Sequence, residues 1–349
     1  MTSTIRILIL RTSAMGDVVM ASPLAEGLRS RYPDARICWL AEPQVAPLLE
    51  GSPALDSVLI WPKMRWKELF RSKQWLTLFR EMNVFIRKLR AEQFTLVIDA
   101  QGLFRTRLLA WLSQAPERIG LVSREPGRFL MTRLIQRGDV TCQMGSEYFH
   151  LLKQLGIDTA DLRQSIHLSS ASFTNASEVL ASSGVHGNYI AFAPFTTRPQ
   201  KHWFEQQWIQ LAHEVTHRLA LPIVWLGGPG DRSSAEILAA AGGGITLAGQ
   251  TSLATSAAII ARSAVLVGVD TGLTHLGTAF NMPTVALFGS TCPYTHTRNP
   301  NTVVLYHQLS CSPCRRKPTC NGQYDCMQAI TVAEVMQVMA QLLEEKTVP

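Results

Sequence analysis

The sequence predicts an α/β protein with two parallel sheets, each covered by helices on both faces. Apolar runs rich in β-branched residues alternate with helical patterns along nearly the whole chain, which is typical of βαβ units. At 349 residues the chain is also longer than one core usually supports,. Because the alternation occurs twice, on either side of a stretch rich in Ser, Thr and Gly, we expect two domains.

The first domain is expected over residues 1–170, followed by a linker at 171–188. Five apolar runs in this domain favour strands, at residues 5–10, 36–40, 57–60, 95–98 and 118–120. Three amphipathic patterns between them favour helices, at residues 18–31, 66–90 and 103–112,.

The second domain is expected over residues 189–330. Its predicted strands are 189–193, 223–226, 264–267 and 284–287, and its predicted helices are 205–218, 233–241, 252–262 and 273–280. One more helical pattern, at 332–345, has no strand after it. We expect the segment 331–349 to pack back on the first domain.

The composition is that of a packed soluble protein, with 46% hydrophobic and 17% charged residues,. The apolar run at 5–10 is far shorter than the ~20 residues of a membrane-spanning helix, and no small-residue cleavage site follows it. We therefore expect a cytoplasmic protein.

Positive charge is concentrated in the first half of the chain. Through Ser170 there are 23 Lys and Arg against 16 Asp and Glu, whereas the remainder has 10 against 10. This asymmetry predicts an anionic partner for the first domain, although a merely solvated face is the alternative, and no nucleic-acid-binding motif accompanies the charge. The candidate contacts are Arg65, Lys67, Arg71, Arg105 and Arg124.

Apolar side chains are interspersed with these charges, at Trp66, Leu69, Phe70, Leu76 and Phe79. A segment that is both basic and apolar can rest on an anionic membrane surface. The same spacing also fits a helix that faces the core, so both interpretations stay open.

In open parallel sheets ligands bind outside the C-terminal ends of strands, so we expect the site on the loops there, in a cleft between the two domains. The first such loop is T-S-A-M-G-D, at residues 12–17. Its single glycine argues against a dinucleotide-binding turn and a P-loop, and hence against an NAD enzyme or a P-loop NTPase. Asp17 lies at a helix start, where it can cap free amides or accept a proton from a hydroxyl.

The second candidate loop, at residues 193–203, follows the strand predicted at 189–193. Thr196 and Thr197 offer hydrogen-bond donors and Lys201 offers a compact positive charge, which suits an oxyanion such as a diphosphate. A plain structural loop is the alternative.

Two further loops join a strand to a helix in the second half. In W-L-G-G-P-G-D, glycines let the backbone approach a ligand and Asp231 can accept from a ribose hydroxyl, although any tight turn looks similar,. In V-G-V-D-T-G-L-T-H-L, Asp270 and Thr271 lie at the N-cap and Gly272 at the helix start, where amides form an anion site,. His275 on the first turn can contact a phosphate or be structural.

Four cysteines form a tight group at Cys311, Cys314, Cys320 and Cys326. Four thiolates at this spacing can hold a tetrahedral zinc or iron ion and brace a loop that has little core of its own. A structural metal is therefore a hypothesis for this segment, whereas a disulfide framework does not fit a cytoplasmic chain.

Taken together, these loops resemble glycosyltransferase family 9, the bacterial heptosyltransferases of lipopolysaccharide core assembly. S-A-M-G-D is similar to the family's S-x-M-G-D, T-T-R-P-Q-K-H-W to its T-T-R…K-x-W, and V-D-T-G-L-T-H-L to its D-T-G-x-x-H-L. The resemblance covers most of the chain. It implies a GT-B architecture, in which two Rossmann-like domains face across a cleft, with the acceptor on the first and the sugar nucleotide mainly on the second.

The resemblance also implies a reaction: inverting transfer of heptose from ADP-heptose onto the Kdo/heptose inner core linked to lipid A, with no cofactor required. Asp17 would be the general base, and Lys201 would pair with the diphosphate. The five basic residues named above would meet the phosphates and carboxylates of the acceptor. The donor pocket would comprise Thr196, Thr197, Asp270, Thr271, Gly272 and His275, and also Asp231, although the sequence around Asp231 does not match the family cleanly.

Two other functions stay open. One is a family relative that uses another nucleotide sugar or a protein acceptor, and some relatives that modify proteins bind iron at a similar C-S-P-C stretch. The other is a catalytically silent, two-lobed ligand-binding module. The placement of Asp17 and Lys201 argues against the silent module.

Overall fold

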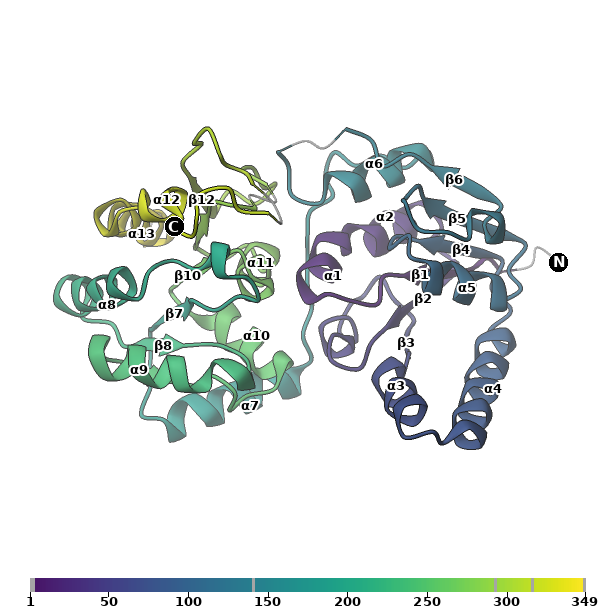
Figure 1. Cartoon of the computed structure of the whole chain (residues 1–349), viewed down its shortest axis with the longest axis horizontal. Coiled ribbons are helices and arrows are strands. Elements are labelled where there is room, and N and C mark those ends of the chain that lie inside the picture. Colours follow the sequence, from purple (N-terminus) through teal and green to yellow (C-terminus); the bar gives the residue numbers. More distant parts are fainter. Residues whose placement is uncertain (1–3, 140–141, 292–293, 315–316, 348–349) are drawn as a thin grey trace. The chain divides into compact units, whose positions relative to one another are not determined.

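The computed structural model of the chain describes residues 4–139, 142–291, 294–314 and 317–347. The chain forms two compact units (Figure 1). The first comprises Met1–Val140 and Gly145–Arg163, and the second comprises Thr141–Met144 and Gln164–Pro349. The short segment ending at Met144 therefore belongs to the second unit, where the Met144 amide donates to the carbonyl of His296 at 2.9 Å.

The first unit is built on a six-stranded parallel sheet with the order β3-β2-β1-β4-β5-β6. The register places Leu8 of the central strand beside Cys38 and Val97 of its two neighbours. The central strand is fully buried from Ile7 onward, as expected for a parallel strand covered on both faces,. The strands are β1 Arg6–Leu10, β2 Arg36–Ala41, β3 Ser57–Ile60, β4 Leu96–Asp99, β5 Glu117–Leu121 and β6 Arg133–Ile135.

Two segments of the first half that were each predicted as one helix form two helices each. The helix predicted at 18–31 divides at Ser22, because Pro23 has no amide hydrogen to donate and begins a new helix,. The helix predicted at 66–90 divides at residues 72–74, where Lys73 has a φ of 58°, a left-handed conformation that ends a helix. The helices of the first unit are α1 Met15–Ala21, α2 Pro23–Arg31, α3 Lys63–Arg71, α4 Trp75–Ala91, α5 Phe104–Leu112 and α6 Ser146–Gln154, with the 3-10 turns η1 Ala46–Leu48 and η2 Arg128–Leu130.

The second unit repeats this design with a six-stranded parallel sheet of order β12-β11-β10-β7-β8-β9. Counted from the first strand of each unit, both sheets have the order 3-2-1-4-5-6 of a doubly wound Rossmann fold. The predicted α/β class with two Rossmann-like parallel sheets is thus confirmed. The strands are β7 Ile190–Ala193, β8 Ile223–Trp225, β9 Ile245–Thr246, β10 Val265–Val269, β11 Thr284–Phe288 and β12 Thr302–Tyr306.

None of the helices in the described part of the chain is both long and apolar enough to cross a membrane.

Most helices of the second unit connect its strands. The helices of this unit are α7 Ser170–Ser182, α8 Glu205–Leu219, α9 Arg232–Gly242, α10 Leu253–Arg262, α11 Gly272–Ala279, α12 Asp325–Gln328 and α13 Val332–Thr347, with the 3-10 turns η3 Pro199–Lys201 and η4 Pro229–Asp231.

The segment predicted as a linker, 171–188, is mostly helix α7. Ser169 caps this helix by accepting from the amide of Ser172. Ala176 and Leu180 are buried in the core of the second unit, where α7 packs on α10. The Ser-rich composition suggests a loop, but the apolar residues recur at helical spacing and a serine cap supports the helix start.

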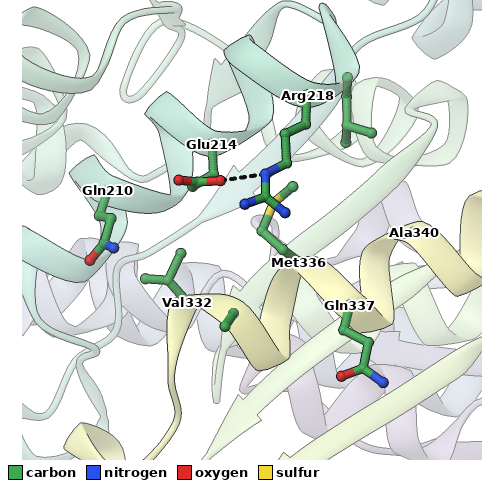
Figure 2. A pocket seen from close by; sticks show the side chains of 9 residues that line it. Gln210, Glu214, Arg218, Val332, Met336, Gln337 and Ala340 are labelled. Atoms are coloured by element: carbon green, nitrogen blue, oxygen red, sulfur yellow. Dashed lines mark ion pairs between the residues drawn. The ribbon is translucent and has the colours of Figure 1, made fainter.

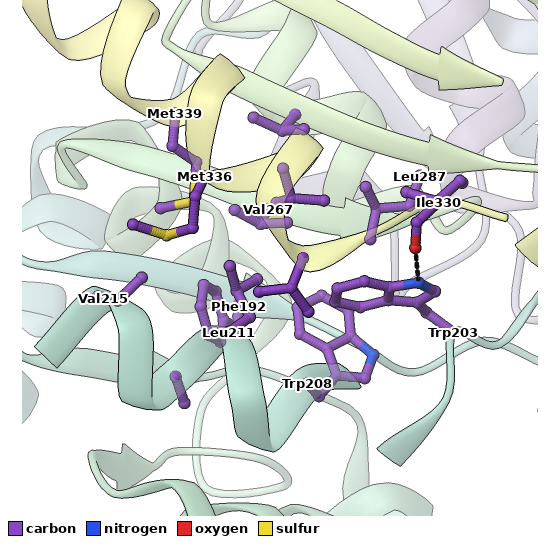
Figure 3. Packing of buried hydrophobic residues seen from close by; sticks show 14 of the residues in the cluster. Phe192, Trp203, Trp208, Leu211, Val215, Val267, Leu287, Ile330, Met336 and Met339 are labelled. Atoms are coloured by element: carbon purple, nitrogen blue, oxygen red, sulfur yellow. Dashed lines mark hydrogen bonds between the residues drawn. The ribbon is translucent and has the colours of Figure 1, made fainter. Parts of the chain in front are cut away.

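The C-terminal helix α13 packs into the core of the second unit, so the prediction that it packs on the first domain is wrong. Val335 and Met339 are fully buried in the cluster that contains Trp208. Figure 3 shows Met336 and Met339 lying over α8, and the Trp203 indole donating to the carbonyl of Ile330 at 3.0 Å. The apolar face of α13 covers the sheet of its own unit, and residues 348–349 of the predicted segment lie outside the described residues.

Candidate active site

The strand order reverses at one point in each sheet, between β1 and β4 in the first unit and between β7 and β10 in the second. Loops at the C-terminal ends of such strands diverge to opposite faces of the sheet and leave room for a ligand. The T-S-A-M-G-D loop follows β1, the loop with Lys201 follows β7, and the D-T-G loop follows β10. The candidate residues therefore lie where the topology favours binding.

Asp17 occupies the first turn of α1 and is held on one side only. Its Oδ2 atom lies 2.5 Å from Arg11 Nη2 and accepts weakly from the Ala14 amide at 3.4 Å. Within the described residues, Oδ1 of Asp17 has no recorded partner. The side chain is 48% exposed, so this free oxygen is open to a substrate hydroxyl.

Arg11 is the buried partner of Asp17, and no sequence motif pointed to it. Burial acts to lower its pKa, but nearby acidic groups, including Tyr148 and Asp17, outweigh burial and raise the pKa above the ordinary value. Tyr148 is itself buried, and burial raises the pKa of its phenol. The guanidinium therefore stays charged and fixes the carboxylate of Asp17.

A second network in this unit surrounds the buried Glu42, which directly follows β2. Its Oε1 atom accepts from the Ser13 hydroxyl at 2.8 Å and pairs with Lys63 Nζ at 2.7 Å. The adjacent Thr12 donates its hydroxyl to Gln101 Oε1 at 2.9 Å. These contacts fix the backbone that leads into Asp17. Glu42 and Gln101 each come just after a strand, and this position was the sequence signal that could have identified them.

The five predicted anion contacts lie on several elements of the first unit. Arg65, Lys67 and Arg71 lie on α3, Arg105 lies in the first turn of α5, and Arg124 follows β5. All five are exposed. Among the described residues, no recorded hydrogen bond or ion pair joins them to one another or to Asp17.

In the second unit, Lys201 and Asp270 meet. Lys201 Nζ lies 2.6 Å from Asp270 Oδ2, and the two side chains are 16% and 7% exposed. The hydroxyl of Thr291 also donates to this oxygen, and His275 Nε2 lies 3.6 Å from Oδ1. Burial alone would raise the pKa of Asp270, but the His275 and Lys201 contacts lower it well below its ordinary range.

The start of α11 lies directly beside this pair. Thr271 is the N-cap residue, and no side chain caps the free amides of the first turn. The Thr196 hydroxyl donates to the backbone carbonyl of Asp270 at 3.1 Å, which ties the two loops together, and Thr197 is exposed on the same loop. His275 is buried, with Nδ1 2.9 Å from the Tyr294 hydroxyl, so it orients Asp270 from within the unit. A cation beside free amides is an arrangement that can hold an anion, so this is the candidate anion site.

Asp231 acts locally as a cap. Its Oδ2 atom accepts from the Gly228 amide at 2.8 Å, at the turn η4 that precedes α9. The side chain is partly exposed, so the other oxygen can still meet a ligand.

Two hollows lie in the second unit. One, of about 580 Å³, is lined by Thr196, Thr197, Phe204 and Tyr324, and so adjoins the loop that carries Lys201. The other, of about 450 Å³, lies between α8 and α13, where Arg218 pairs with Glu214 at 2.6 Å (Figure 2). The second hollow lies between helices and away from the strand ends, so we assign it no part in the site.

The predicted structural metal site consists of the four clustered cysteines. Burial raises the pKa of the Cys326 thiol, and the neighbouring thiols raise it further. In the described part of the chain, however, no group of three or more His, Cys, Asp or Glu side chains is arranged to hold a metal ion.

Two Rossmann-like units, the second with a candidate anion site at its switch point, have the architecture of GT-B glycosyltransferases. The sequence pattern of glycosyltransferase family 9 (heptosyltransferase) matches residues 82–325. The chain belongs to this family and is a glycosyltransferase.

Individual relatives agree with the family match. The chain is 30% identical to lipopolysaccharide heptosyltransferase 1 of Pseudomonas aeruginosa over 323 residues, which cover 91% of this chain and 88% of that protein. It is similar to the solved glycosyltransferase family 9 structure from Veillonella parvula, with a TM-score of 0.85 at 24% identity over 99% of both chains. It is also similar to Escherichia coli heptosyltransferase WaaC with ADP, with a TM-score of 0.75 at 25% identity over 97% of this chain and 100% of that chain.

Proposed function

We propose that this glycosyltransferase moves a heptose from ADP-heptose onto the Kdo/heptose inner core of lipopolysaccharide, with inversion at the anomeric carbon. The Lys201–Asp270 pair beside the uncapped start of α11 is the observation that carries the proposal. The names of the relatives support heptose as the sugar, and the similarity to WaaC, which was solved with ADP, supports an ADP-linked donor.

The second unit takes the donor in this proposal. As the bond between the sugar and the diphosphate breaks, negative charge grows on the departing ADP. Lys201 and the first amides of α11 stabilise that charge, which is the contribution that preorganised donors make to such transition states. Thr196, Thr197 and Asp231 complete the binding of the diphosphate and ribose, while Asp270 and His275 hold Lys201 in place.

The first unit takes the acceptor. An acceptor hydroxyl attacks the anomeric carbon, its proton passes to the free Oδ1 of Asp17, and ADP leaves with the bonding electron pair. The buried Arg11 keeps the Asp17 carboxylate in position throughout. Arg65, Lys67, Arg71, Arg105 and Arg124 give this unit the positive surface that an acceptor rich in phosphates and carboxylates requires.

The protein itself supplies the positive charge that the leaving group needs, so we propose that transfer requires no cofactor. In this proposal Lys201 neutralises part of the diphosphate charge, a task that a divalent cation performs in metal-dependent enzymes. Turnover should therefore be unchanged after dialysis against a chelator, and a rate restored only by an added divalent cation would contradict this part of the proposal.

A transfer assay tests the function directly. The full chain is incubated with ADP-heptose and Kdo-lipid A, and mass spectrometry follows the acceptor. We expect the mass of one heptose to be added while ADP is released. Addition of a different sugar, when other nucleotide sugars are supplied, would reassign the donor, and labelling of a protein in place of Kdo-lipid A would reassign the acceptor. ADP binding without any transfer would indicate a silent binding module.

A further inference from the structure

The hairpin of α3 and α4 has an apolar tip that the protein leaves uncovered. Figure 1 shows the two helices extending together from the sheet edge at β3. At the turn between them the exposed fractions are 58% for Phe70, 51% for Trp75, 89% for Leu76 and 69% for Phe79. Phe70 and Trp75 contact each other edge to face, with ring centroids 4.8 Å apart.

The opposite end of the hairpin is anchored in the first unit. Leu89 is buried at this end, and Leu69, which lies closer to the turn, is buried as well. Trp66 packs edge to face on Phe85 at 5.3 Å and on Trp61 at 6.3 Å. The apolar residues at the tip therefore do not serve the core of the unit, and nothing in the fold explains why they are apolar.

Basic side chains surround this tip. Lys67, Arg71, Lys73 and Arg80 are exposed, and among the described residues none of them has a recorded ion pair. The two acidic residues of the hairpin, Glu68 and Glu81, are both within 4 Å of Arg65. Both acidic side chains thus lie beside Arg65, while the four cations at the tip have no ion pair among the described residues.

We infer that this tip, defined by Phe70, Trp75, Leu76 and Phe79 with its four surrounding cations, docks on an anionic lipid bilayer. Apolar side chains enter the interface while neighbouring lysines and arginines meet lipid phosphates, and the two contributions together give reversible binding. Trp75 also suits the interface because its ring is amphipathic.

Charge favours the bilayer over a second copy of this chain. Residues 63–90 contain nine Lys and Arg against two Glu, so two hairpins would repel each other at close range. The inference rests on the proposed function in one respect, because an acceptor linked to lipid A lies in a membrane and a docked enzyme would reach it.

Vesicle sedimentation tests the inference. The full chain is mixed with vesicles of phosphatidylglycerol and phosphatidylethanolamine, or of phosphatidylcholine alone, with no lipopolysaccharide present. We expect binding to the anionic vesicles, weak binding to the neutral ones, and loss of binding as salt is raised. Equal binding to both vesicles, or none to the anionic ones, would overturn the inference.

Matched variants locate the surface. Leu76→Ser with Phe79→Ser should lower vesicle partitioning at least tenfold, and Lys73→Gln with Arg80→Gln should lower it roughly 25-fold, about fivefold for each charge. The controls are Ile237→Ser, an exposed apolar residue on α9, and Arg31→Gln with Lys153→Gln, which remove two exposed charges elsewhere in the first unit. Equal losses in the controls would contradict docking through the hairpin.

The test separates this inference from the proposed function. With a water-soluble, deacylated acceptor, the tip variants should transfer sugar at the parent rate, because they leave the site intact. Normal transfer without vesicle binding would contradict the docking surface alone. Vesicle binding without transfer would contradict the proposed reaction alone. Concentration-dependent self-association that the tip variants abolish would show instead that a second copy covers the tip.

Discussion

Each candidate site holds a functional side chain with a buried partner of opposite charge. In the first unit the buried Arg11 holds Asp17, and in the second the buried Asp270 holds Lys201. Because the partner fixes the orientation of the functional group beforehand, less freedom is lost when the substrate arrives. The functional groups of the two pairs carry opposite charges, since one is a carboxylate and the other an ammonium group.

Replacing Asp17 with Asn should abolish turnover and leave donor binding unchanged. Asn keeps the size of the side chain and a contact to Arg11, but it cannot take a proton. We expect kcat to fall by about 10² to 10⁴, the usual contribution of general base catalysis, while the Kd for ADP stays within twofold. Asp34→Asn, an exposed carboxylate in the same unit, is the control. A parent-like rate for the Asp17 variant would mean that Asp17 serves only as a cap.

Replacing Lys201 with Ala should weaken ADP binding and slow transfer. A charge-assisted hydrogen bond typically contributes about 1.5–3 kcal/mol, so the Kd for ADP should rise about tenfold or more. Calorimetry measures the affinity, and Lys317→Ala, an exposed lysine of the same unit, is the control. An unchanged affinity would count against a diphosphate contact.

Replacing Asp270 with Asn should destabilise the second unit in a way that depends on pH. The buried pair with Lys201 is lost, which costs about 3 kcal/mol near neutral pH. Folding lowers the pKa of Asp270 from its ordinary value of 3.8, so its contribution to stability is complete above that value and is lost as the pH falls through the lower folded value. Urea unfolding followed by tryptophan fluorescence should therefore show a difference that shrinks below about pH 4. A difference that grows on acidification would refute this reading of the pair.

The sequence predicted the members of these sites that lie in motif-bearing loops better than their partners outside such motifs. Asp17, Lys201 and Asp270 follow strands and lie in recognisable loops. Arg11 and Thr291 give no such signal, because Arg11 directly continues a strand and Thr291 is 21 residues from the aspartate to which it donates. The fold of the second unit brings Thr291 to Asp270, whereas Arg11 reaches Asp17 across the turn of one loop.

At the scale of elements, β10 and α11 approach so closely that only glycine fits between them. A Cβ atom on Gly268 would overlap the Thr274 hydroxyl and would lie 3.1 Å from the Cβ atom of Ala193. Gly268→Ala should therefore push α11 away from the sheet, lower stability by about 1–3 kcal/mol and weaken ADP binding. Thermal unfolding and calorimetry measure the two effects.

A matched alanine substitution controls for the general effect of losing a glycine. Gly230 has open space around its Cβ position and no positive φ, so Gly230→Ala should leave the melting temperature nearly unchanged. If both variants melt alike, close packing between β10 and α11 is not what requires Gly268.

The sequence predicted central strands more reliably than edge strands and helix boundaries. β1, β4, β7 and β10 are continuous apolar runs because helices cover both of their faces. By contrast, β9 has only two residues, and most of β12 is half-buried, so neither carries a strong apolar signal. The breaks at Pro23 and Lys73 are set by single residues and were missed inside longer amphipathic patterns.

At the scale of the whole molecule, the proposed reaction divides donor and acceptor between two units of equal strand order. Hydrogen exchange tests this division, because a bound ligand slows exchange where it orders the backbone. ADP should protect amides at residues 194–203 and 269–275 and leave residues 11–17 near their free rates. Protection confined to residues 11–17 would reverse the assignment of the two units.

The sequence indicated two domains from the repeated alternation, but not how the chain is shared between them. The Ser-rich segment is a helix of the second unit, and α13 belongs to the same unit. Packing determines that both helices belong to the second unit, because the apolar face of each contacts residues that are far away in the sequence.

The segment Thr141–Met144 belongs to the second unit although it lies between two parts of the first in the sequence. This limits how the enzyme can be recombined with its relatives. A chimaera made by a single junction near residue 163 would carry a foreign segment at 141–144. In this chain the Met144 amide donates to the carbonyl of His296, and Gln164 Nε2 donates to the Met144 carbonyl at 3.1 Å. Grafting the first unit of a relative onto this second unit therefore calls for three junctions, with the recipient's own residues 141–144 kept between two grafted pieces.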